Sequence, residues 1–128
     1  MPDTKTFNPW LGRIFTGVPA VMLTASAIMK LAGVADVVKM LNGQLGAPIA
    51  TIAPIGVLEL VCVVLYVVPK TAVLGAVVLT GYLGGAVAIH VRAGEFSPAP
   101  LVLGVMVWAG LYFQDARVRA LMPVRSVD

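Results

Sequence analysis

Residues 50–68 read ATIAPIGVLELVCVVLYVV, an apolar run in which Glu59 is the only charged side chain. An α-helix rises about 1.5 Å per residue, so Glu59 would lie roughly 14 Å along it, near the middle of a hydrocarbon layer about 30 Å thick. A carboxylate at that depth costs a few kcal/mol. We therefore expect Glu59 to face the protein interior, to have a partner there and to mark a site.

The whole chain has the composition of an integral membrane protein. Of its 128 residues, 59% are hydrophobic and 12% are charged, and the mean hydropathy is +0.96. A soluble domain of this size could not bury so much apolar surface. The apolar runs, none of which alternates like a membrane β-strand, cover residues 14–32, 50–68, 71–91 and 99–113. We expect one all-α domain over residues 1–128, a transmembrane four-helix bundle.

Basic residues near the ends of the spans predict the orientation, because they are enriched on the cytoplasmic side. The side with both termini holds Lys5, Arg13, Lys70, Arg117, Arg119 and Arg125, whereas the opposite side holds Lys30, Lys39 and Arg92. Both termini are therefore expected to be cytoplasmic. The net charge of +3 mainly reflects this bias and is too dispersed to indicate nucleic-acid binding.

The connection between the first two spans, residues 34–48, predicts a short amphipathic helix with Asp36 as its N-cap. Its apolar positions are Val37, Val38, Met40, Leu41 and Leu45, and its polar positions are Lys39, Asn42 and Gln44. Such a helix either lies at the outer membrane surface as a lid over the bundle or is an ordinary connector. Both interpretations stay open.

The ionisable residues of the spans gather at one end of the predicted bundle. With both termini inside, the first span ends outside near Lys30, the second runs inward to Glu59, and the third ends outside at His90. This convergence predicts a polar site of these three residues. Each also has a simpler interpretation, because Lys30 could be an interfacial cation, His90 a helix C-cap, and Glu59 a structural partner of Lys30 or Tyr66.

Rows of side chains at spacings of three and four predict the surroundings of this site. The rows are Gly56, Glu59, Cys62, Val63 and Tyr66; Tyr82, Ala86 and His90; and Gly104, Trp108 and Tyr112. Aromatic side chains beside a buried acid suit a planar lipophilic ligand, and plain helix packing explains the same rows equally well. On the third span, Gly81, Gly84 and Gly85 predict a ridge for close helix contact, either within the bundle or in an oligomer, on the face opposite His90.

The sequence lacks the residues that several kinds of reaction or cofactor site require. Cys62 is the only cysteine in the sequence, which excludes dithiol exchange within one chain. His90 is the only histidine, so the chain cannot supply two histidine ligands to a haem. A zinc site is not predicted either, because Glu59, Glu95 and His90 are too few plausible ligands.

Several segments together resemble one family. They are MKL at residues 29–31, GAP at 46–48, G-x-x-E-L at 56–60, GYLGGAVAIHVR at 81–92 and the ending at 111–121. The combination is similar to the DoxX-like family of small four-helix bacterial membrane proteins. The resemblance implies a multi-pass protein of the bacterial cytoplasmic membrane, with Lys30, Glu59 and His90 at recurrent polar positions of the family. It also implies a link to membrane redox complexes, because the family is named after a thiosulfate:quinone oxidoreductase subunit; the paired cysteines of a direct redox role are missing here.

Three functional hypotheses follow. In the favoured one, the bundle binds a quinone-like or other lipophilic molecule and supports a redox partner protein within the lipid membrane. Its ligand-binding residues would be Lys30, Glu59, Tyr66, His90, Trp108 and Tyr112. The second is a stand-alone enzyme for proton transfer or isomerisation of a lipophilic substrate, with Glu59 and His90 as acid and base. The third and weakest is a proton-coupled transporter, which would require the chain to form a homo-oligomer.

Overall fold

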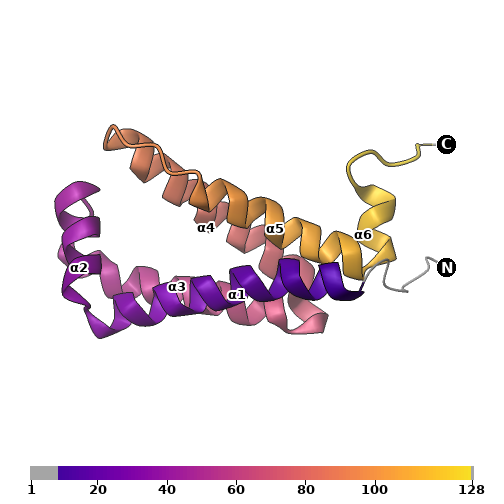
Figure 1. Cartoon of the computed structure of the whole chain (residues 1–128), viewed down its shortest axis with the longest axis horizontal. Helices are drawn as coiled ribbons and strands as arrows, with labels where there is room; N and C mark the ends of the chain where they lie inside the picture. The colour runs from indigo at the N-terminus through magenta and orange to yellow at the C-terminus, as the bar shows by residue number, and fades with distance from the viewer. Residues whose placement is uncertain (1–8, 128) are drawn as a thin grey trace.

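The computed structural model describes residues 9–127, and its regular structure is helical (Figure 1). The four long helices are α1 (Pro9–Ala32), α3 (Ile49–Val67), α4 (Ala72–Arg92) and α5 (Ala99–Gln114). The shorter elements are α2 (Ala35–Val38), η1 (Lys39–Gln44), η2 (Pro69–Thr71) and α6 (Ala116–Leu121). Because no strand occurs between residues 9 and 127, the all-α prediction is confirmed.

The four long helices form an antiparallel ring, in which α1 packs against α3 and α5 and α4 packs against the same two helices. Three helical segments (α1, α3, and η2 together with α4) are long and apolar enough to cross a membrane, and α5 is a shorter apolar helix. Large hydrophobic side chains such as Val57, Val61 and Val64 are exposed on the outside of α3. A helix that is apolar on its outer face as well is typical of a membrane span. The fold is therefore compatible with a membrane helical bundle.

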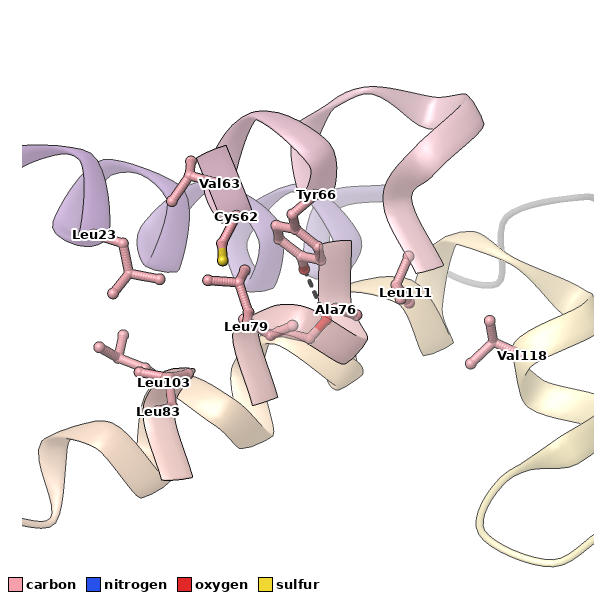
Figure 2. Close-up of a cluster of buried hydrophobic side chains, with 11 residues drawn as sticks. Leu23, Cys62, Val63, Tyr66, Ala76, Leu79, Leu83, Leu103, Leu111 and Val118 are labelled. Atoms are coloured by element: carbon pink, nitrogen blue, oxygen red, sulfur yellow. Dashed lines mark hydrogen bonds between the residues drawn. The ribbon is translucent and has the colours of Figure 1, made fainter. Parts of the chain in front are cut away.

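The ring is closed tightly at the end where α1 begins and α6 lies (Figure 1). Glycines allow the helices to cross closely there: a Cβ atom on Gly75 would overlap the backbone of Tyr66, and one on Gly110 would overlap the hydroxyl of Thr16. The Tyr66 hydroxyl donates a hydrogen bond of 2.7 Å to the carbonyl oxygen of Val107. Figure 2 shows this bond within a buried cluster to which all four long helices contribute.

Toward the other end, the α4–α5 pair diverges from the α1–α3 pair, and α2 and η1 lie at that end (Figure 1). A second buried cluster forms here from Leu41, Leu45, Ala47 and Ile52. Ile89 of α4 packs against this cluster, so the α2–η1 connection contacts both arms of the diverging bundle.

The connection is helical, as expected, but its geometry differs from the prediction. Val34 occupies the N-cap position of α2 without a side-chain hydrogen bond, and Asp36 lies in the first turn. The prediction that Asp36 caps this helix is therefore wrong. The next segment, η1, is a π-helical turn that ends with the amide of Leu45 donating to the carbonyl oxygen of Met40. The location of the connection at a membrane surface stays a prediction.

Candidate functional site

The carboxylate of Glu59 lies inside the bundle and forms an ion pair with Lys30. The Nζ atom of Lys30 is 2.9 Å from Oε1 of Glu59, and the two side chains are only 8% and 2% exposed. The charges come from the facing surfaces of α1 and α3, which pack directly against each other. Because a buried charge without a partner is strongly destabilising, this pairing makes the burial of Glu59 tolerable.

The ammonium group of Lys30 has three N–H donors, and each has an acceptor. Nζ donates to Ser26 Oγ over 2.7 Å, to Glu59 Oε1 over 2.9 Å and to the Tyr82 hydroxyl over 3.2 Å. These acceptors belong to α1, α3 and α4, respectively. The lysine therefore links three helices, and all of its hydrogen-bond donors are used within the protein.

The ion pair lies in the wall of a cavity of about 810 Å³. All four long helices line the cavity, and Val37, Met40 and Leu41 of the α2–η1 connection contribute to its lining. Most of the lining residues are apolar. The polar lining residues are Ser26, Lys30, Glu59, Tyr82, His90 and Ser97. The cavity is thus an apolar chamber with a small number of grouped polar side chains.

His90 lines the same cavity near the end of α4. Its Nδ1 atom is 2.7 Å from the carbonyl oxygen of Ala86. A carbonyl oxygen can only accept a hydrogen bond, so Nδ1 carries the hydrogen, and Nε2 is an acceptor in the neutral ring. No hydrogen bond joins His90 to Lys30 or Glu59 within the described part of the chain. The structure therefore brings the three predicted polar residues to one cavity without linking all three directly.

Three predicted wall residues lie elsewhere. The hydroxyl of Tyr66 is bonded to Val107 in the closed core. The indole N–H of Trp108 donates to the Thr80 hydroxyl over 2.8 Å, and Trp108 lines a separate groove between α4 and α5. The ring of Tyr112 contacts the edge of Phe113.

None of these three aromatic side chains lines the 810 Å³ cavity, so their grouping with Glu59 as walls of one site is not supported by the lining. Tyr66 lies on the same face of α3 as Glu59. It is seven residues further along the helix, however, which corresponds to about 10 Å along the helix axis. At that level α4 and α5 have already closed against α3.

The three ridge glycines of α4 make no close helix contact within the described part of the single chain. A Cβ atom at Gly81, Gly84 or Gly85 would have no neighbouring atom within 4 Å. A contact of this ridge with a second copy of the chain stays a prediction. Gly81 and Gly85 also line the large cavity that His90 borders. Gly84 lines the separate groove.

Two residues of the polar cluster were not assigned to the site from the sequence. Ser26 precedes Lys30 by one helical turn, a spacing that places both side chains on one helix face. Tyr82 precedes His90 by eight residues in the row already identified on the third span. Both signals were present in the sequence, but only the tertiary structure shows that these hydroxyl groups meet the Lys30 ammonium.

The arrangement suits binding of a molecule more readily than binding of a metal. Residues 9–127 contain no group of three or more histidine, cysteine or acidic side chains that could hold a metal ion. Cys62 is a free, buried thiol in the cavity wall. The ion pair makes the centre of the site neutral overall, within mostly apolar walls.

Comparison with known proteins gives one positive result. A family model described as the DoxX-like family matches residues 14–110, which is most of the chain and includes Lys30, Glu59, Tyr82 and His90. No curated protein matches the chain. No solved structure matches it either.

Proposed function

The chain belongs to the DoxX-like family, and from this premise we propose that it is a membrane protein that binds a lipophilic molecule with a polar head. The head would lie at the Lys30–Glu59 pair and the apolar part in the rest of the cavity. In this proposal Tyr82 and His90 complete the polar end of the binding site.

The observation that carries this proposal is the placement of the buried ion pair in the wall of an apolar cavity of about 810 Å³. Pockets for small molecules commonly measure about 300–1,000 Å³ and combine apolar walls with a few grouped polar side chains. A pair with only a structural role would gain nothing from bordering a cavity of this size. The cavity would also leave many side chains without packing partners unless a molecule filled it.

The proposal extends to the setting of the protein. A quinone-like molecule fits the chemistry, and the chain would then be an accessory subunit that holds this molecule for a redox partner protein. The buried, single Cys62 argues against a thiol redox reaction within this chain. We further propose the bacterial cytoplasmic membrane as its location, with both termini on the cytoplasmic side, as the distribution of basic residues predicts.

An acid–base enzyme is the second candidate, favoured by one observation. Glu59 and the Nε2 atom of His90 border the same cavity, so one substrate could contact both. Glu59 would have to exchange a proton while its Oε1 atom remains paired with Lys30. Turnover of any lipophilic substrate that survives Glu59→Gln in a correctly assembled protein would eliminate this candidate.

Mass spectrometry of small molecules retained by the gently purified protein tests the main proposal. We expect a lipophilic molecule in the wild-type protein and less of it in a Gly85→Leu variant, because the leucine would project into the cavity and take up part of its volume. Gly84→Leu is the matched control, since it adds the same side chain one residue away and into the separate groove. An equal amount of ligand in both variants, or none in wild-type protein from native membranes, would contradict the proposal.

A further inference from the structure

We propose that the cavity selects a neutral lipophile whose head donates a hydrogen bond, such as an alcohol, a phenol or the reduced quinol form of a quinone. Heads that only accept hydrogen bonds and anionic heads would bind weakly. This inference rests on the proposed function and specifies the class of ligand. It follows from counting which hydrogen-bonding groups of the site are already used.

The charged donors of the site are used within the protein. The three N–H groups of Lys30 are directed to Ser26, Glu59 and Tyr82. A ligand carbonyl would have to displace one of these acceptors to reach the ammonium. The Tyr82 hydroxyl also interacts with Glu59, so the Ser26 hydroxyl hydrogen remains, a neutral donor that forms weaker hydrogen bonds than a charged one.

The charged acceptor of the site is used only in part. A carboxylate has two oxygens with about four acceptor positions. The hydrogen bond from Lys30 occupies one position on Oε1 of Glu59, and the Tyr82 hydroxyl also interacts with this carboxylate. The neutral His90 ring adds a second acceptor, Nε2, on the same cavity. A ligand that donates a hydrogen bond therefore finds a partly free carboxylate, which forms the stronger, charge-assisted kind of bond.

The balance of charges in the cavity wall predicts that anionic head groups also bind weakly. Lys30 is the only lysine or arginine in the cavity lining of the described chain, and its charge is matched by Glu59. An anionic head would lie against the Glu59 carboxylate without a cation of its own. Like charges at close range in a buried site are strongly unfavourable. The site therefore disfavours fatty acids and other anionic amphiphiles.

Binding of three matched probes to the wild-type protein tests this inference. The probes are a decyl-substituted phenol, a decyl-substituted acetophenone and a decyl-substituted benzoate, which share a ring and a tail. We expect the phenol to bind about tenfold to a hundredfold more tightly than the other two, the range for a hydrogen bond to a charged group. Uptake of each probe by protein-free detergent micelles provides the correction for partitioning into detergent.

A double variant, Lys30→Met with Glu59→Leu, links the preference to the ion pair. Replacing a buried ion pair with apolar side chains of similar volume is often neutral for stability. We expect this variant to bind the acetophenone and the phenol equally well. A preference for the phenol that persists in the double variant would overturn the assignment of Glu59 as the acceptor.

The outcomes also separate this inference from the proposed function. If the acetophenone or the benzoate binds wild-type protein as tightly as the phenol, the cavity is a binding site, but the inferred selectivity is wrong. If no probe associates with wild-type protein more strongly than it partitions into protein-free micelles, both the binding function and the selectivity are overturned.

Discussion

A Cβ atom on Gly56 would lie 3.0 Å from the Cβ atom of Lys30 and 3.1 Å from the carbonyl oxygen of Ala27. Gly56 therefore lets α3 approach α1 closely, one helical turn before Glu59. This close approach sets the position from which Lys30 reaches the carboxylate. The ion pair thus depends on a glycine that carries no functional group.

The first prediction concerns this close contact. Gly56→Ala should destabilise the protein by about 1–3 kcal/mol, the usual cost of an added methyl group in a packed interior. The added atom must displace α1 or the stem of Lys30, so ligand retention should fall as well. Thermal unfolding in detergent or nanodiscs measures the first effect. Gly17→Ala is the control, because a Cβ at Gly17 would have no neighbour within 4 Å; equal stability losses in the two variants would contradict the argument.

The second prediction concerns the energy of the ion pair. Lys30→Met alone or Glu59→Leu alone should each cost about 3–5 kcal/mol, because each leaves a buried charge without its partner. The double variant should be more stable than either single variant. Denaturant unfolding of the four proteins forms a double-mutant cycle. Additive losses would show that the two charges do not stabilise each other.

The third prediction distinguishes the roles of Tyr66 and Tyr82, two tyrosines on helices that contribute to the site. Tyr66→Phe should reduce stability by about 0.6 kcal/mol, a typical value for a side-chain hydrogen bond within a membrane protein. It should leave binding of the phenol probe unchanged, because Tyr66 is bonded to Val107 and does not line the cavity. A clear loss of probe binding would restore Tyr66 as a ligand-binding residue.

Tyr82→Phe is the matched change on the cavity side. It removes one of the three acceptors of Lys30 and so releases an N–H group toward the cavity. The affinity for the acetophenone should therefore rise relative to that for the phenol, which titrations of the two probes would measure. An unchanged affinity ratio would show that Tyr82 does not control the donors of the site.

The fourth prediction concerns pH and the junction between α5 and α6. Asp115 accepts hydrogen bonds from the backbone amide and from Nε of Arg117 over 2.9 and 3.0 Å. The hydrogen bond from the Arg117 side chain is the main reason that the pKa of Asp115 is lowered from its ordinary value of 3.8. A lowered pKa in the folded state means that the carboxylate stabilises the fold above the ordinary value. This contribution disappears as the pH falls through the folded-state pKa.

The stability difference between wild-type protein and Asp115→Asn should therefore be present at neutral pH and vanish in strong acid. It should be small, because the Arg117 side chain is largely exposed and solvent screens the pair. Melting temperatures of both proteins across a pH series provide the measurement. A difference that increases as the pH falls would have the wrong sign for this explanation.

Part of the fold and of the site could be predicted from the sequence alone. The apolar runs predict helices because a membrane requires every backbone group to be bonded within its own segment. The isolated acid at position 59 predicts an inward-facing, partnered carboxylate, since exposure to lipid would be too costly. The end of the bundle that holds Lys30, Glu59 and His90 also follows from the alternating direction of the spans.

Other features depended on how the helices pack. A membrane helix is apolar both toward lipid and toward its neighbours, so its residue pattern does not distinguish the two faces well. This is why the sequence predicts a contact ridge at Gly81 and Gly85 without showing that, within one chain, both positions border the cavity. For the same reason, the residue pattern predicts Tyr66, and not Tyr82, as a wall residue of the site.

The sequence by itself determined the helical class, the membrane environment and the need for a partner to Glu59, because each follows from the transfer energies of single residues along one helix. The tertiary structure alone decided which side chains meet. Close crossings at Gly75 and Gly110 hold the helices together at one end, and the α2–η1 connection contacts both arms at the other. The angle between the helices results from these contacts between distant segments, and that angle determines which rows of side chains border the cavity.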